Sequence, residues 1–195
     1  MNTIIRSPLA FAISAALATT ALPASAQEDA VKIVQSKCLA CHTEESHTKN
    51  NEGAPQWSRI SHQRKTPEGW LMTIGRMQMM HGLQISDDDR SAVVKYLADR
   101  QGLAPEETAD YRYAMERRLD TMEAFDDSFF EEMCARCHSG ARVGLQRRPA
   151  EEWEHLVHFH LGQWPSTEYQ ALARDRDWFP MAINDMVPKL AKMFP

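Results

Sequence analysis

All four cysteines of the 195-residue chain lie in two short strings, and each string ends in a histidine. The strings are Cys38-Leu39-Ala40-Cys41-His42 and Cys134-Ala135-Arg136-Cys137-His138. In a C-x-x-C-H string both thiols can bond to vinyl groups on one edge of a porphyrin, and the histidine can bind the iron as its proximal ligand. The spacing therefore predicts two covalently attached c-type hemes, one on each string.

Cysteine pairs also have other uses in proteins. Two disulfides need no histidine after each pair, and a thioredoxin-like motif belongs to a βαβ unit, which this sequence lacks. A zinc site with Cys₂His₂ or Cys₄ ligands is the remaining rival. We expect heme attachment and proximal ligation from six residues: Cys38, Cys41, His42, Cys134, Cys137 and His138.

An internal repeat narrows the choice of distal iron ligands. After each heme motif the chain carries a basic pair, a proline, acids and a tryptophan, at residues 64–70 and 147–153. Met77 stands seven residues after the first of these tryptophans, and His160 stands seven residues after the second. Electron-transfer cytochromes fill the sixth iron position with Met or His. The repeat therefore predicts Met77 for the first iron and His160 for the second.

Neighbouring side chains keep both distal assignments open. For the first iron the alternatives are Met80 and His81, with Met79 close by. For the second iron the alternatives are His155, His158, Met181 and Met186. His155 and His158 share one face of the expected helix, and His160 lies on another. Only one of these two faces can be directed toward the porphyrin.

The second basic pair, Arg147 and Arg148, has two interpretations. Surface charges are most often simply solvated. Alternatively, the planar fork of arginine suits the propionate groups of a heme. The tryptophans are expected to lie in the core rather than to relay electrons: Trp57, Trp70, Trp153 and Trp164.

The elements that must position these residues are helices. Residues 28–37 carry apolar side chains at helical spacing just before the first motif. Ser86 followed by three aspartates predicts a helix start, and a further helix is expected over residues 126–133. No run of alternating β-branched residues indicates a sheet. We predict an all-α fold of two tandem modules like class I cytochrome c, residues 27–103 and 104–195, joined by a link over residues 101–110.

The N-terminus predicts the compartment. Residues 1–26 contain a basic start, a short apolar run and a small-residue Ala24-Ser25-Ala26 exit, which is typical of a secretory signal peptide cleaved after Ala26. We therefore expect a periplasmic protein. The formal net charge of −5 gives no basic excess for nucleic acid, and no further apolar run is long enough to span a membrane.

Two stretches beyond the heme motifs resemble a known family. The first is KTPEGW at residues 65–70, followed by Arg76-Met77 and by YLADRQGLAPE at residues 96–106. The second is VHFHLGQWP at residues 157–165, followed by EYQ at residues 168–170. Together they resemble the N-terminal diheme region of the alpha subunit of quinohemoprotein amine dehydrogenase. The resemblance covers essentially the whole expected mature chain.

This resemblance implies a part in the oxidation of primary amines. It implies that a cysteine tryptophylquinone in a separate subunit reacts with the amine, and that the diheme region passes the electrons to a soluble cytochrome c or blue copper protein. It also implies partner subunits that carry the quinone and β-rich domains. In this chain every cysteine belongs to a heme motif, so no residue is left to form the quinone. The alternatives are a free-standing diheme electron shuttle and a diheme peroxidase.

Overall fold

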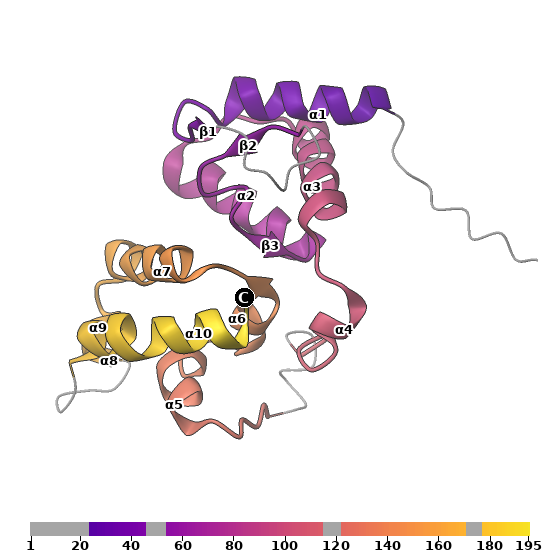
Figure 1. Cartoon of the computed structure of the whole chain (residues 1–195). Coiled ribbons are helices and arrows are strands. Elements are labelled where there is room, and N and C mark those ends of the chain that lie inside the picture. The colour runs from indigo at the N-terminus through magenta and orange to yellow at the C-terminus, as the bar shows by residue number, and fades with distance from the viewer. Residues whose placement is uncertain (1–23, 46–53, 115–121, 171–176) are drawn as a thin grey trace, which may run out of the picture.

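The computed structural model describes residues 24–45, 54–114, 122–170 and 177–195. Within these ranges the chain is mostly helical, as predicted, and each strand is only two residues long. Figure 1 shows two groups of helices, one above the other, with the short helix α4 (Pro105–Thr108) in the connection between them. The predicted signal peptide lies almost entirely outside the described residues. No helix in these ranges is long and apolar enough to cross a bilayer.

Three helices and a small strand pair surround the first hydrophobic core. The helices are α1 (Ala24–Lys37), α2 (Pro67–His81) and α3 (Asp87–Gln101), and the paired strands are β1 (Glu44–Glu45) and β2 (Gln56–Trp57). The buried side chains come from α1, β2, α2 and α3: Ala30, Val34, Trp57, Trp70, Ile74, Val93, Tyr96 and Leu97. The core therefore joins the helix before the first heme motif to the helices that follow it.

Local sequence explains where α2 and α3 begin and end. The Thr66 hydroxyl accepts a hydrogen bond from the amide three residues later at 3.2 Å, and the Ser86 hydroxyl does the same at 3.1 Å. The N–H of Gly82, with a φ of 72°, donates to the carbonyl of Met77 and ends α2. The predicted helix start at Ser86 is confirmed.

The second hydrophobic core lies among shorter helices. These are α5 (Ser128–Phe130), the π-helical turn η1 (Glu131–Ala135), α6 (Ala141–Gly144), α7 (Ala150–Gln163), α8 (Thr167–Gln170), α9 (Trp178–Met181), the π-helical turn η3 (Ala182–Met186) and α10 (Val187–Met193). The core side chains are Phe130, Met133, Val143, Trp153, Val157, Trp178, Ala182, Met186, Val187, Leu190 and Phe194. The helix expected over residues 126–133 is found as α5, which continues into η1 and so carries Cys134.

A strand pair joins the two halves. Strand β3 (Arg64–Lys65) pairs antiparallel with β4 (Gln146–Arg147), and Arg64 stands opposite Arg147. When Trp70 is aligned with Trp153, these two arginines are also equivalent positions of the repeat. An antiparallel pairing of equivalent residues is the arrangement around a two-fold axis. At this strand pair the two segments of the repeat are therefore related as a local two-fold axis would relate them.

Glu107 of α4 clamps both arginines of this pair. Its carboxylate accepts two hydrogen bonds from Arg64, at 2.9 and 2.6 Å, and lies 3.6 Å from Nε of Arg147. Arg147 also donates to the carbonyl of Glu107 at 2.6 Å. Arg147 and Arg148 are only 8% and 5% exposed. The expectation that they are solvated is wrong. Strand pairing and the α4 contact bury Arg147, and Arg148 packs against Gln146, Glu152 and Trp153.

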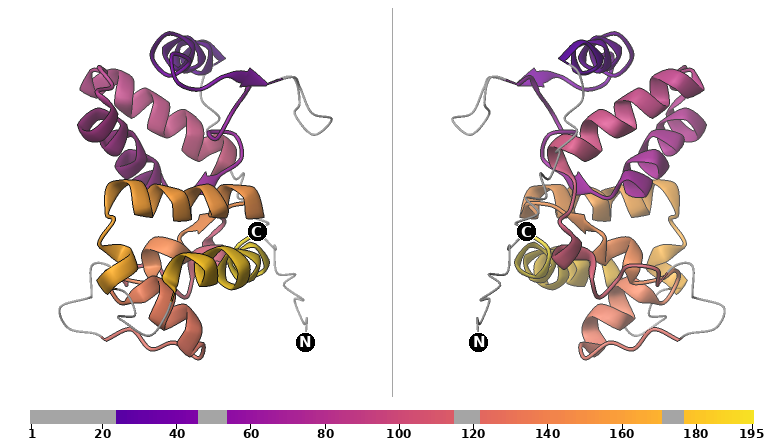
Figure 2. Two further views of the ribbon diagram at one scale, coloured as in Figure 1. Left: turned by 90° about the vertical axis from the view of Figure 1, so that its left-hand side faces the viewer. Right: turned by 90° about the vertical axis from the view of Figure 1, so that its right-hand side faces the viewer.

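The tryptophans follow the prediction with one exception. Trp57, Trp70 and Trp153 are at most 2% exposed and belong to the two cores. Trp164, however, is 44% exposed, because it follows the last turn of α7, where the chain leaves the second core. Figure 2 shows that α7 lies on the side of the second half that faces the first half.

Candidate heme sites

Two histidines face each other in the second half. His138 follows η1, and His160 lies near the end of α7. The centroids of their rings are 6.4 Å apart and the ring planes are inclined by 40°. A metal ion held between two imidazole nitrogens at about 2 Å from each would separate the centroids by about 6 Å. The two residues that sequence reasoning paired are therefore brought to the spacing of axial ligands.

Each of these imidazoles has one nitrogen already engaged. Nδ1–H of His138 donates to the carbonyl of Ser139 at 3.0 Å, and Nδ1–H of His160 donates to the carbonyl of Leu156 at 2.8 Å. A carbonyl can only accept, so the proton must sit on Nδ1 and the lone pair on Nε2. Metal-binding histidines are oriented in this way. Both rings are thus prepared to bind iron through Nε2.

The space between these histidines is lined mainly by apolar side chains. Together with His138, His160 and the Cys134-to-Cys137 segment, the lining includes Met133, Val143, Trp153, Leu156, Val157, Trp178, Ala182, Met186 and Leu190. Burial lowers the pKa of His160, although its hydrogen bond to Leu156 opposes the shift. A lowered pKa keeps the imidazole neutral, as ligation requires. An apolar slot between two facing imidazoles fits a porphyrin.

The alternatives for the second iron are placed differently. Nδ1 of His155 lies 3.5 Å from Glu152, on the side of α7 that faces the first half. The side chain of His158 packs against Phe179 and is 57% exposed. Met181 packs against the outside of the core. Of these four residues only Met186 lines the described cavity. His160 is the candidate with both the ring spacing and the supporting hydrogen bond.

The cysteines carry free thiols in both motifs. Burial, helped by Asp127, raises the pKa of the Cys134 thiol to about 12, and burial raises that of Cys38, with Cys41 adding to it. Among the described residues no three His, Cys, Asp or Glu side chains converge as a zinc site requires. Thioether attachment through these thiols stays a prediction.

The first motif repeats the histidine geometry of the second. Cys38 closes a tight turn in which its carbonyl accepts from the amides of Cys41 and His42 at 3.1 and 3.0 Å. Nδ1–H of His42 donates to the carbonyl of Ser58 at 2.9 Å. This bond again leaves Nε2 free for a metal. The sequence could not predict that the carbonyls of Ser58, Ser139 and Leu156 accept hydrogen bonds from these histidines, since every residue has a backbone carbonyl.

Met77 lies on the face of α2 that carries Trp70 and Ile74. In the repeat these three residues match Trp153, Val157 and His160 of α7, so both distal candidates occupy the same place on equivalent helices. No contact between Met77 and His42 is found in the part of the chain that the structure describes, and Met77 stays a prediction.

The alternatives to Met77 are more exposed. Met79 and Met80 are 78% and 42% exposed, and His81, the last residue of α2, is exposed as well. Met77 is half-buried. A side chain that already points along the buried face of its helix needs the smallest rearrangement to reach an iron held in the first core. Burial therefore ranks Met77 first among the methionines near the end of α2.

Comparison with known proteins gives a family. Residues 28–195 match the family model described as quinohemoprotein amine dehydrogenase A, alpha subunit, haem binding. No curated protein compared with the chain matches it. The match covers nearly all of the 195 residues, including both heme motifs and both equivalent helices. It confirms the resemblance identified from residues 65–77, 96–106 and 157–170. The chain therefore belongs to the haem-binding family of the quinohemoprotein amine dehydrogenase alpha subunit.

Proposed function

We propose that this chain is a periplasmic diheme c-type cytochrome unit that relays electrons in an amine dehydrogenase. The electrons would come from a quinone cofactor in a partner subunit and go to a soluble cytochrome c or blue copper protein. The observation that carries the proposal is the pair of facing imidazoles, His138 and His160, in an apolar slot beside a C-x-x-C-H motif. Family membership links this heme role to amine oxidation.

The residues of the second site favour electron transfer over catalysis at iron. A heme bound there supplies one-electron iron chemistry. His138 and His160 would occupy both axial positions and leave none for peroxide. Trp153, Met186 and Leu190 line the slot with apolar side chains that are at most 5% exposed. A low-polarity site with both ligands supplied by protein suits an iron that changes charge without changing partners, which argues against the peroxidase alternative.

The proposal gives one heme to each half. The first would be held by Cys38, Cys41 and His42, with Met77 as distal ligand; the second by Cys134, Cys137 and His138, with His160. The equivalent placement of Met77 and His160 on α2 and α7 supports two tandem cytochrome-like modules. Methionine ligation raises heme potential relative to histidine. The second heme would then accept electrons from the quinone, and the first would deliver them to the acceptor.

The number and attachment of the hemes can be counted directly. The full chain is produced in a bacterial host whose periplasm attaches c-type heme, and the mature protein is weighed intact. We expect the mass of two added hemes on a chain beginning at Gln27. A variant with Cys38→Ala and Cys41→Ala should lose one heme, and the matched Cys134→Ala and Cys137→Ala variant should lose the other. A colourless wild-type protein would refute the proposal.

The link to amine oxidation needs a separate test. The tagged protein is purified from the organism that encodes it, grown on a primary amine, and its partners are identified by mass. Recovery of a small quinone-bearing subunit supports the dehydrogenase role. If the protein carries two hemes but purifies alone, and if no quinone-bearing subunit reduces it, it is the free-standing shuttle instead.

A further inference from the structure

Two buried cations occupy equivalent positions of the repeat. Lys65 and Arg148 each stand five residues before the tryptophan of the repeat in their own half, and they are 3% and 5% exposed. Nζ of Lys65 lies 5.2 Å from the ring centroid of Trp70, and Cζ of Arg148 lies 5.6 Å from that of Trp153. Both cations therefore stack on the tryptophan of their own half. A buried cation against the tryptophan in each half indicates a role that both halves share.

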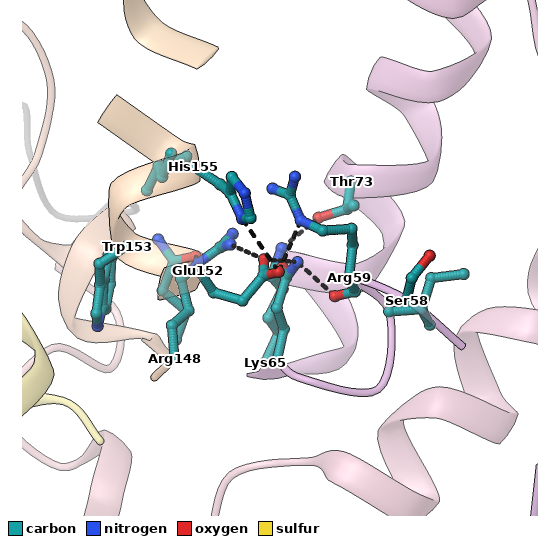
Figure 3. A network of polar contacts seen from close by, with 12 residues as sticks. Ser58, Arg59, Lys65, Thr73, Arg148, Glu152, Trp153 and His155 are labelled. Atoms are coloured by element: carbon teal, nitrogen blue, oxygen red, sulfur yellow. Dashed lines mark hydrogen bonds and ion pairs between the residues drawn. The ribbon is translucent and has the colours of Figure 1, made fainter. Parts of the chain in front are cut away.

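The surroundings of these cations hold more positive charge than negative. Arg76 and Arg59 lie near the pair, and in the described part of the chain Glu152 is the only carboxylate that contacts the cluster (Figure 3). Glu152 is 3% exposed. It lies 2.7 Å from Nε of Arg59 and 3.5 Å from Arg148, and it accepts from Gln63 at 3.0 Å. One acid thus serves several cations.

Burial makes these charges costly in the polypeptide alone. Burial lowers the pKa of Lys65 well below its usual value, and Arg148 and Arg76 lower it further. Burial likewise lowers the pKa of Arg148 to about 10, against the opposing effect of Glu152. A buried cation is retained only where an anion or a set of acceptors stabilises it. The cluster lacks anionic charge.

Hydrogen-bond donors are also in excess at these positions. Nζ of Lys65 has three N–H groups, and among the described residues it donates to the Thr73 hydroxyl alone, at 2.8 Å. The buried indole N–H of Trp70 has no partner in the described structure. In the second half the indole N–H of Trp178, which lines the heme slot, has none either. The first half therefore has donors in excess at Lys65 and Trp70, and the second half has one at Trp178, beside the slot.

We propose that Lys65 and Arg148 bind the propionate carboxylates of the two hemes, one heme from each half, at the junction between the halves. The proposal deepens the proposed function and rests on it. A propionate supplies both the anionic charge and the acceptor oxygens that the cluster lacks. The guanidinium fork of Arg148 can bind a carboxylate through two parallel hydrogen bonds, and Lys65 can bind one as a point charge.

Arg147 takes no part in this binding. Its guanidinium is already satisfied by the carbonyl of Gly144 at 2.7 Å and by Glu107. It also stacks on Phe194, with Cζ 5.3 Å from the ring centroid. Arg148 donates through Nε to the side chain of Gln146 at 2.9 Å. Its two terminal nitrogens, one of them 3.5 Å from Glu152, still have N–H groups to offer a heme carboxylate.

Reduction potentials of the mature diheme protein test the proposal. Lys65→Met and Arg148→Met should each lower the potential of one heme, because an unpaired propionate stabilises ferric iron. The lowered potential should also become pH-dependent as that propionate titrates, beside Glu152, His155 and Arg59. Arg64→Gln is the matched control, since Arg64 neighbours Lys65 but pairs with Glu107, and it should leave both potentials unchanged. Lys65→Arg should restore the wild-type value.

A second measurement needs no substitution and so does not depend on variant folding. Infrared difference spectra are recorded between oxidised and reduced wild-type protein carrying hemes labelled with ¹³C in the propionates. We expect carboxylate bands shifted as they are in ion-paired carboxylates. Bands of freely solvated carboxylates on two hemes with normal axial ligands would overturn the propionate inference and leave the diheme function intact. Potentials that shift on adding inorganic phosphate would overturn it too, because the site would then be open to solution anions.

Discussion

The ring of Tyr111 packs directly on the backbone of Gly144. A Cβ at position 144 would lie 2.4 Å from Cγ of Tyr111, closer than side-chain atoms approach one another. Gly144 is buried, and its carbonyl accepts the hydrogen bond from Arg147, so the backbone has little room to withdraw. This contact attaches the segment after α4 to the turn that follows the second heme motif.

Gly144→Ala should destabilise the protein by about 1–3 kcal/mol, the usual cost of overpacking a filled site. Gly75→Ala is the matched control, because a Cβ there meets nothing within 4 Å and the position lies inside α2. Alanine in a helix interior is favoured over glycine by about 1 kcal/mol, so the control should be slightly stabilised. Thermal unfolding of the two heme-loaded variants measures both effects. Equal melting temperatures would contradict the packing argument.

His160→Ala should open the sixth position of the second iron while heme attachment by Cys134 and Cys137 persists. We expect one of two hemes to become high-spin and to bind carbon monoxide when reduced, as seen by absorption and electron paramagnetic resonance. His158→Ala removes an imidazole two residues away that is mostly exposed, and it should leave the spectra unchanged. A His160→Ala protein with two low-spin hemes would transfer the assignment to Met186.

Met77→Ala should abolish the sulfur-to-iron charge-transfer absorption of the oxidised protein and lower the potential of one heme. The physical reason is the loss of a thioether ligand that favours ferrous iron. Met79→Ala is the control, since its side chain is 78% exposed. Loss of the band in Met80→Ala, with Met77→Ala unaffected, would move the ligand one turn along α2.

Glu152→Gln should destabilise the protein by about 3 kcal/mol, because removing one partner of a buried ion pair leaves the other, here Arg59 at 2.7 Å, uncompensated. Denaturant titration of the heme-loaded protein, followed by tryptophan fluorescence, measures the change. Glu154→Gln alters a half-exposed carboxylate of the same helix and should change stability by less than about 0.5 kcal/mol. Similar losses of stability in the two variants would show that the effect does not depend on the place of Glu152 between the two halves.

The clamp at Glu107 predicts an acid-sensitive contribution to stability. Hydrogen bonding to Arg64 holds the pKa of this carboxyl below its ordinary 4.5, with the Ala104 amide assisting. Because the folded pKa is depressed, the stabilisation is complete above the unfolded pKa and is lost as pH falls through the folded one. Wild type should therefore exceed Glu107→Gln in denaturant midpoint at pH 7, and the difference should shrink below pH 4.5. The exposed neighbour Glu106→Gln serves as the control.

The sequence predicted the heme motifs, the helices and the equivalence of Met77 and His160, because these depend on spacing along the chain. It predicted the capped start of α3 at Ser86 for the same reason. The boundary between residues 103 and 104 stays a prediction. Strands β3 and β4 were missed, since two residues are too few to show an alternating pattern.

The contacts at the junction between the halves could not be predicted from the sequence either. Arg148 carries the same charge whether it is solvated or buried, and residue type alone does not distinguish the two. Its burial depends on contacts between segments far apart in the sequence, because the preceding residue, Arg147, pairs with Arg64, 83 positions before it. The role of Glu152 likewise arises only when α7 is brought against Arg59 of the other half. Long-range contacts of this kind follow from the fold and not from local pattern.

The repeat of the sequence does not extend to the charges at the junction between the halves. Where the second half places Glu152, the first half has Gly69, so the carboxylate at the junction belongs to one side only. The first half brings Lys65, Arg59 and Arg76. Glu152 lies 2.7 Å from Arg59 and 3.5 Å from Arg148, so this one acid of the second half serves cations of both halves. The balance of charge between the halves therefore depends on both being present, since two copies of the first half would bring no carboxylate at this position.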